Sequence, residues 1–192
     1  MPYNKLIFLR HAETKHDENS VISKWDLTEK GKKEAINVLN SEIFNDVDII
    51  ITSSEEKAYE TAHPLCEKLH KEIIRDENLN EIKRDQGSYL KTKDEYITFI
   101  KLCMENRNHS YNNWETANHL LKRFSKAIQE IDLEFSKKNI LIVAHGVVIN
   151  LYFAKILGKL ENTFERWMTN TFCDYGIIQN NKVIKDIAKI ND

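Results

Sequence analysis

The sequence of 192 residues contains few of the residues that interrupt regular structure. Five glycines and two prolines are present, and no stretch is rich in glycine, proline or serine. Flexible linkers and low-complexity segments have such compositions, so neither is expected here. We therefore predict one domain over residues 1–192, a length that allows a substantial core without disulfides.

Cysteine is equally scarce. Cys66, Cys103 and Cys173 are far apart, odd in number and include no Cys-x-x-Cys pair, which fits buried thiols in a reducing compartment better than a disulfide scaffold. The apolar part of the first segment, MPYNKLIFLRH, is too short for a signal peptide, and no uninterrupted apolar run approaches the length of a membrane span. We expect a cytoplasmic protein with no membrane partner.

Neither sign of charge is in large excess. Lysine and arginine number 28 against 30 aspartates and glutamates, which leaves a formal charge of −2. This balance supplies no broad positive field for wrapping nucleic acid or adhering to anionic lipid, so we expect no nucleic-acid partner. Any site for an anion must be local.

Short apolar segments alternate with longer amphipathic ones. The apolar segments predict buried strands at residues 3–9, 47–52, 71–76 and 140–144. The amphipathic segments predict helices at residues 28–40, 94–106, 116–136 and 147–157. This alternation predicts an α/β fold, a three-layer αβα sandwich with a mostly parallel central sheet.

Local signals add two further elements. Ser53 and Glu56 have the spacing of a capping box, so a helix is expected to begin there and to kink or break at Pro64. Asn180 and Asn181 tolerate the positive φ of a tight turn and predict a C-terminal hairpin.

Polar residues directly follow three of the predicted strands. Arg10 and His11 follow the first, Ser53 the second, and His145–Gly146 the last. Ligands of parallel sheets bind beyond the carboxyl ends of the strands, so we expect these residues to share one site. Lys57 and two helix N-termini add positive charge there, and the whole set favours a phosphate group.

A neutral histidine in such surroundings can attack phosphorus. Nearby cations hold the phosphoryl oxygens and also lower the pKa of the imidazole. The leaving alkoxide then needs a proton from a carboxylic acid. Glu81, just past the third strand, is the best-placed candidate.

Six motifs resemble, in their order, those of the histidine phosphatase superfamily, the phosphoglycerate mutase-like proteins. Together they extend over nearly the whole chain. They are LRHAET (9–14), LTEKGKKEA (27–35), SSEEKAYETA (53–62), LNE (79–81), WET (114–116) followed by Arg123, and VAHG (143–146).

The resemblance implies the same fold and a role for each site residue. His11 would be the nucleophile and carry a transient phosphohistidine, and Glu81 would act as acid and then as base toward water. Arg10 and His145 would bind the phosphoryl group. Lys57, Gly146 and Asp17 match further phosphate-binding positions. The chemistry requires no metal and no cofactor.

Three residues depart from the family pattern. Lys57 stands where arginine is usual; it keeps the charge but lacks the fork that grips two phosphoryl oxygens. Asp17 stands where asparagine is common, and its carboxylate would repel phosphate unless a lysine pairs with it. Asp85 stands where glycine is common, which leaves Glu77 and Asp85 as alternative acids beside Glu81.

Residues 82–115 are expected to form a small cap over the site. This segment contains four cations, namely Lys83, Arg84, Lys91 and Lys93. A solvated loop is the default for such a run, and the alternative is a loop that overhangs the site and helps to select an anionic substrate.

The predicted function is metal-independent hydrolysis of a small phosphorylated metabolite through a phosphohistidine. One alternative is a phosphomutase of the phosphoglycerate mutase type, which must exclude water and needs more cover than this chain carries. A second is a phosphate-binding protein with weak or lost turnover, supported only by Lys57 and Asp17. Apolar residues on the terminal strands allow a homodimer.

Overall fold

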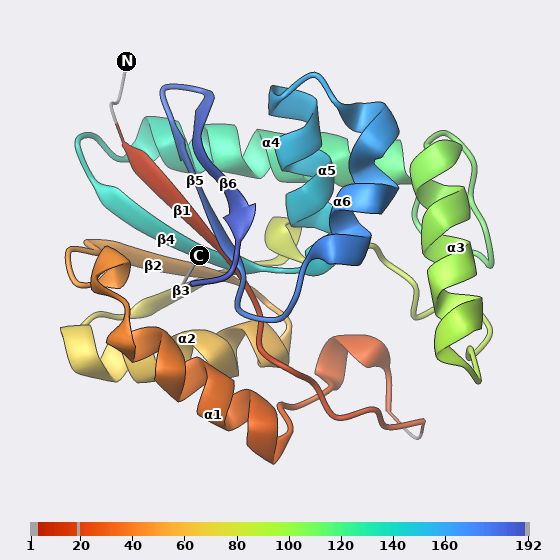
Figure 1. Cartoon of the computed structure of the whole chain (residues 1–192), viewed down its shortest axis with the longest axis horizontal. Helices are drawn as coiled ribbons and strands as arrows, with labels where there is room; N and C mark the ends of the chain where they lie inside the picture. The colour runs from red at the N-terminus through yellow and green to blue at the C-terminus, as the bar shows by residue number, and fades with distance from the viewer. Residues whose placement is uncertain (1–3, 19, 191–192) are drawn as a thin grey trace.

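Six strands form one sheet at the centre of the molecule, and helices cover both of its faces (Figure 1). The computed structural model describes residues 4–18 and 20–190. The strands are β1 (Lys5–Arg10), β2 (Ile49–Ser53), β3 (Ile73–Asp76), β4 (Asn139–Ala144), β5 (Tyr175–Gln179) and β6 (Lys182–Ala188). The helices are α1 (Glu29–Asn37), α2 (Glu56–Leu69), α3 (Lys93–Glu105), α4 (Ala117–Glu134), α5 (Gly146–Ile156) and α6 (Thr163–Thr169).

The sheet is parallel except at one edge. Its order is β3-β2-β4-β1-β5-β6, with β3, β2, β4 and β1 parallel and the hairpin β5–β6 antiparallel. Asn180 and Asn181 form the hairpin turn with φ of 52° and 56°. The mostly parallel sheet confirms the predicted α/β fold.

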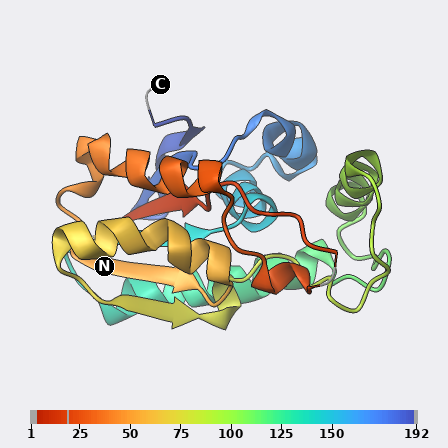
Figure 2. The same ribbon diagram turned by 90° about the horizontal axis from the view of Figure 1, so that it is seen from below.

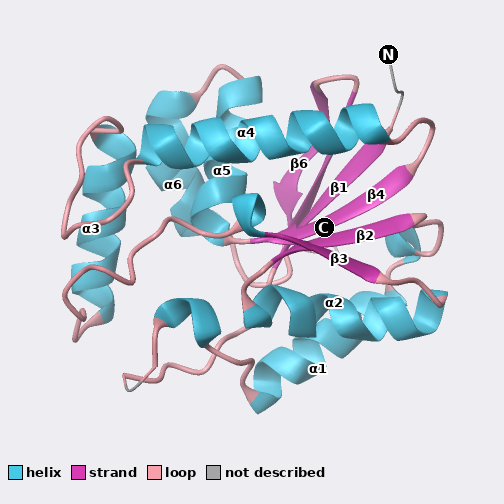
Figure 3. Ribbon diagram, turned by 180° about the vertical axis from the view of Figure 1, so that it is seen from behind, coloured by secondary structure: helices cyan, strands magenta, loops and turns pink. Residues whose placement is uncertain are grey.

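Strand β1 shows how the sequence separates two cores. Leu6 and Phe8 project to one face of the sheet, where they pack among buried residues of α4 and α5. Ile7 and Leu9 project to the other face and pack among buried residues of α1 and α2. The period of two follows from the pleat of the strand. Figure 3 shows the resulting layers, with α4 on one side of the sheet and α1 and α2 on the other.

Most element boundaries lie within two residues of those expected. Thr28 caps α1, since its side chain accepts a hydrogen bond from the Gly31 N–H, and a 3₁₀ turn at Val38–Asn40 continues that helix. The first strand begins at Lys5. The predicted start of this strand at Tyr3 lies outside the described residues.

The helix predicted after β2 is present as α2, but its predicted capping box is wrong and it is not broken at Pro64. Ser53 and Glu56 form no capping box. Ser53 is still part of β2, where it pairs with Asp76 of β3, and the helix begins at Glu56. The N-cap residue is Glu55, and its side chain makes no capping hydrogen bond. Pro64 does not break the helix, which continues to Leu69. Ala62 and Leu65 beside the proline are fully buried, and this packing outweighs the loss of one backbone hydrogen bond.

The segment of residues 82–116 lies to one side of the sheet. It contains α3, which packs against α6, and a Thr92–Glu95 capping box that begins α3. The segment between β1 and α1 extends toward the same side of the molecule (Figure 2). Within the described ranges, no helix is both long enough and apolar enough to span a bilayer.

Candidate active site

The register of the sheet brings the two histidines together. β1 and β4 are parallel neighbours that pair Arg10 with Ala144, so the next residues, His11 and His145, leave the sheet side by side. Their ring centroids are 5.0 Å apart. Both rings line a cavity of about 620 Å³ together with Arg10, Lys57 and Glu81. These five residues are called the inner part of the cavity below.

His11 is set up as a neutral nucleophile. Its Nδ1 lies 2.7 Å from the Ala12 carbonyl oxygen, which can only accept a hydrogen bond, so Nδ1 carries the proton and Nε2 keeps its lone pair. Burial lowers the pKa of His11 well below its usual value, and the positive charges of Lys57 and Arg10 lower it further. The ring is therefore neutral near pH 7.

His145 lies at the N-terminus of α5 and is fully buried. Its Nε2 is 2.7 Å from the Ser53 hydroxyl. When this hydroxyl donates to Nε2, the proton of the ring is on Nδ1. Nδ1 is buried and has no hydrogen-bond partner among the described residues. Burial, followed by the charges of Lys57 and Arg84, lowers the pKa of His145 well below its usual value.

Arg10, like His145, has one buried nitrogen without a hydrogen-bond partner among the described residues. Its Nη1 donates to the Asn170 carbonyl at 3.1 Å, and its guanidinium lies 4.7 Å from the centroid of the Phe172 ring. Its Nε makes no hydrogen bond within the described part of the chain. Gly146 permits this position, because a Cβ there would lie 3.1 Å from the guanidinium carbon and Nε of Arg10. Any larger residue at this position would force the guanidinium to move by a few tenths of an ångström.

Glu81 is buried over the N-terminus of α5. Its Oε2 accepts the Val147 N–H at 2.8 Å, and its Oε1 accepts those of Ile82 and Val148 at 3.0 and 3.1 Å. Oε2 thus keeps one lone pair for a proton. Burial raises the pKa of Glu81 above its usual value, although these backbone bonds oppose the shift. Arg123 of α4 donates a hydrogen bond to the backbone carbonyl of Glu81 at 2.7 Å and so helps to hold the position of this residue.

The two alternative acids are placed less well. Glu77 is exposed and belongs to a 3₁₀ turn after β3, away from the residues that line the cavity. Asp85 lines the cavity but is exposed, and it accepts a hydrogen bond from the Ser23 hydroxyl at 2.9 Å.

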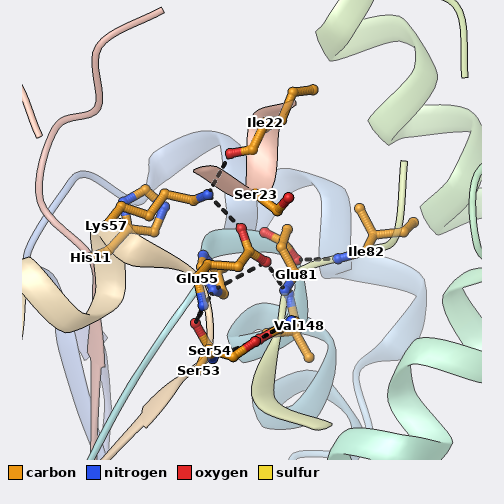
Figure 4. Close-up of polar contacts among 12 residues, drawn as sticks. His11, Ile22, Ser23, Ser53, Ser54, Glu55, Lys57, Glu81, Ile82 and Val148 are labelled. Carbon is orange, nitrogen blue, oxygen red and sulfur yellow. Dashed lines mark hydrogen bonds and ion pairs between the residues drawn. The ribbon is translucent and has the colours of Figure 1, made fainter. Parts of the chain in front are cut away.

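Lys57 is part of a buried ion pair that the sequence did not predict. Its ammonium donates to the Ile22 carbonyl at 2.8 Å and to the Glu55 carboxylate, and both partners of the ion pair are at least 94% buried. Glu55 also accepts the Glu81 N–H at 2.7 Å and lies 3.5 Å from Nε2 of His145. Figure 4 shows Glu55 between Lys57 and Glu81. Burial lowers the pKa of Lys57.

Asp17 is not brought to the inner part of the cavity. It lies on the segment between β1 and α1, where its carbonyl accepts the indole N–H of Trp25 at 2.9 Å. Its neighbours His16 and Glu18 line the cavity, whereas Asp17 is absent from the described lining residues.

Two residues of the site were missed or undervalued at the level of sequence. Glu55 gave no signal, because SSEE after a strand looks like an ordinary acidic helix start. Arg84 was one of four cations for which a solvated loop was the default. It lines the cavity, as do Lys91 and Lys93, and its guanidinium lies 4.8 Å from the centroid of the Tyr96 ring. Its position three residues after Glu81 was the only available indication.

Comparison with known proteins agrees with this geometry. The family profile described as the histidine phosphatase superfamily (branch 1) matches residues 6–192. The chain belongs to this superfamily. Phosphoserine phosphatase 1 of Hydrogenobacter thermophilus is 24% identical over 201 aligned positions, which cover 97% of this chain and 92% of that protein. Both findings confirm the predicted family and its enzyme class, a phosphatase.

Solved structures of histidine phosphatases show the same fold. The mycobacterial glucosyl-3-phosphoglycerate phosphatase superimposes with a TM-score of 0.75 at 17% identity, covering 95% of this chain and 97% of that one. The alpha-ribazole phosphatase of Shigella flexneri gives 0.71 at 19% identity, covering 96% of each chain.

Proposed function

We propose that this histidine phosphatase hydrolyses a small phosphate monoester through a phosphohistidine on His11, without a metal ion. One observation supports the proposal above the others. A neutral His11 with a free Nε2 lies beside two buried nitrogens that have no partner among the described residues, Arg10 Nε and His145 Nδ1. Arg10 Nε is a donor, and His145 Nδ1 is a donor when the Ser53 hydroxyl donates to Nε2. A phosphoryl group offers acceptors for both donors and an electrophile for the lone pair.

The first step transfers the phosphoryl group to the enzyme. Nε2 of His11 attacks phosphorus, and the bond between phosphorus and the ester oxygen breaks. The proton on Glu81 Oε2 passes to the leaving oxygen, which departs as an alcohol. Arg10 and His145 bind the phosphoryl oxygens throughout, and Gly146 leaves room for Arg10 to do so.

The second step releases phosphate. Glu81, now ionised, takes a proton from water as the water oxygen attacks phosphorus. The bond between phosphorus and Nε2 breaks, and its electron pair returns to His11. Each proton given in the first step is recovered in the second, so the enzyme ends in its starting state.

The relatives support a phosphate monoester as substrate but not one compound. Their names specify phosphoserine, glucosyl-3-phosphoglycerate and alpha-ribazole phosphate, and these have only the phosphate ester in common. We therefore infer only that the substrate is a phosphate monoester, on the basis of the phosphoryl chemistry.

Hydrolysis of 4-nitrophenyl phosphate in the presence of EDTA tests the proposal. We expect turnover by the wild type and a loss of at least about 10⁴-fold in His11→Ala, because the nucleophile is removed. The phosphoglycerate mutase alternative is tested in parallel by adding 3-phosphoglycerate with bisphosphoglycerate, where we expect phosphate release and no isomerisation. Full activity in His11→Ala would refute the proposal.

Two wider expectations remain part of the proposal. We place the enzyme in the cytoplasm, acting on small molecules and not on nucleic acid. A homodimer through the terminal strands would cover Ile184 of β6, which is 62% exposed. Light scattering of the purified protein measures the oligomeric state.

A further inference from the structure

The cavity is much larger than its inner part requires. Its volume of about 620 Å³ lies within the range of roughly 300–1,000 Å³ found for pockets that enclose drug-sized ligands. Beyond the inner part, the cavity continues between the segment after β1, the segment after Glu81, α3 and α6. We call this continuation the outer part; in the proposed reaction it holds the alcohol that leaves.

Three aromatic side chains form one wall of the outer part. Trp114, Tyr96 and Trp167 line the cavity as a continuous group, with ring centroids 6.1 Å apart for the first pair and 5.9 Å for the second. Trp114 and Trp167 are themselves buried, with only 3% and 9% exposed. The accessible faces of this wall are therefore those of the half-buried Tyr96 and of the planar Arg84 guanidinium, which lies over both Tyr96 and Trp114. Guanidinium and aromatic planes both accept a stacked ring.

A second aromatic group, from different segments, lines the same cavity. His16 lies 4.8 Å from Trp25 and 5.5 Å from Tyr89, measured between ring centroids. The phenol of Tyr89 lies 3.0 Å from the nearer nitrogen of His16, so the segment after β1 and the segment after Glu81 hold each other at this point. These three rings form the second wall.

We propose that the alcohol of the physiological phosphate ester carries a planar ring that stacks against these walls. The inference rests on the proposed function and narrows its substrate class. A flat ring gains both apolar burial and favourable ring geometry from such a lining. A short polar alcohol, such as a serine or glycerol unit, would leave the partly exposed rings of Tyr96, Trp25 and Tyr89 in contact with water and gain neither.

A matched set of alkyl phosphates tests the inference without a difference in leaving-group chemistry. Ethyl, 2-cyclohexylethyl and 2-phenylethyl phosphate release primary alcohols of similar acidity and differ in the group that enters the outer part. We expect kcat/KM for the phenyl compound to exceed that for ethyl phosphate by roughly 10- to 100-fold, as stacking on one or two faces implies. It should also exceed that for the cyclohexyl compound several-fold.

Variants locate the effect in the walls. Tyr89→Ala and Tyr96→Leu should each lower the ratio of kcat/KM for phenylethyl to ethyl phosphate several-fold, and this ratio is independent of how much of the variant is folded. Tyr59→Ala is the matched control, since Tyr59 packs on Arg75 and lies outside this cavity. Its ratio should equal that of the wild type.

Failure of the inference and failure of the proposed function give different results. Equal kcat/KM for the phenyl compound and for either of the other two would overturn the inference while the phosphatase proposal stands. Unchanged ratios in both wall variants would also overturn it. Absence of turnover with all three esters and with 4-nitrophenyl phosphate would instead refute the proposed function.

Discussion

The inner and outer parts of the cavity are built from different kinds of structure. Arg10 is the last residue of β1, His11 and His145 directly follow the paired strands β1 and β4, and Glu81 is fixed by the N-terminus of α5. The walls of the outer part come from two irregular segments and from the helices α3 and α6. The difference teaches that the sheet positions the groups that react, whereas the segments between its elements determine which alcohol fits.

The comparison also extends to charge. The inner part holds Lys57, which is ion-paired with the buried Glu55 behind it, two neutral histidines and a carboxyl with a raised pKa. The second wall of the outer part has the exposed pair His16 and Tyr89, which contact each other at 3.0 Å and belong to no ion pair among the described residues. Changes in the inner part should therefore have large and specific effects, and changes in this wall small ones.

After loss of the nucleophile, the largest expected effect concerns the acid. Glu81→Gln keeps the shape of the side chain but removes its proton, so kcat/KM for an alkyl phosphate should fall by about 10² to 10⁴-fold. With 4-nitrophenyl phosphate, whose leaving group needs no proton, kcat/KM should fall far less. Steady-state kinetics with both esters test this prediction. An equal loss of kcat/KM with both esters would show that Glu81 has another role.

The buried ion pair should matter strongly for stability. Lys57→Met leaves the Glu55 carboxylate buried without its partner and should lower the free energy of unfolding by about 3–5 kcal/mol. Adding Glu55→Gln to this variant should restore much of the lost free energy of unfolding. His16→Ala, in the outer part, should change the free energy of unfolding by less than about 0.5 kcal/mol. Urea unfolding measures all of these; equal losses in Lys57→Met and His16→Ala would contradict the contrast.

A smaller effect is expected where Gly146 faces Arg10. In Gly146→Ala the new methyl would lie 3.1 Å from Arg10 and from the indole nitrogen of Trp167, so the guanidinium must shift. The inhibition constant for inorganic phosphate should weaken roughly tenfold, as for one lost charged hydrogen bond. Gly158→Ala is the control: φ there is 67° and no atom lies within 4 Å, so stability should fall without a change in phosphate binding.

The smallest predicted change is a shift in pH dependence. The pKa of Glu81 is raised first by burial and further by the charge of Glu55. Glu55→Gln removes that charge, so the pKa of Glu81 should fall and the alkaline limb of the kcat profile should move to lower pH. The extra net positive charge should also tighten phosphate binding a few-fold. An alkaline limb at the wild-type pH, with unchanged phosphate inhibition, would show that Glu55 does not act on the acid.

The contrast between the two parts also explains what the sequence could predict. Strand ends follow from hydrophobic periodicity, so Arg10, His11 and His145 were identifiable together, and the ordered motifs supplied Glu81. Glu55 could not be predicted, because its contacts with Lys57 and Glu81 depend on tertiary packing. The same holds for the aromatic walls. His16, Trp25 and Tyr89 lie on irregular segments without periodicity, and Tyr96 and Trp167 look like ordinary apolar positions of helices.

Trapping of the phosphoenzyme tests the central claim most directly. Glu81→Gln should still form a phosphohistidine with 4-nitrophenyl phosphate but should hydrolyse it slowly, because the base for water is absent. The account predicts a burst of nitrophenolate equal to the enzyme present and phosphate on His11 by mass spectrometry after an alkaline quench. Steady release of nitrophenolate by this variant, with no burst and an unmodified His11, would contradict it.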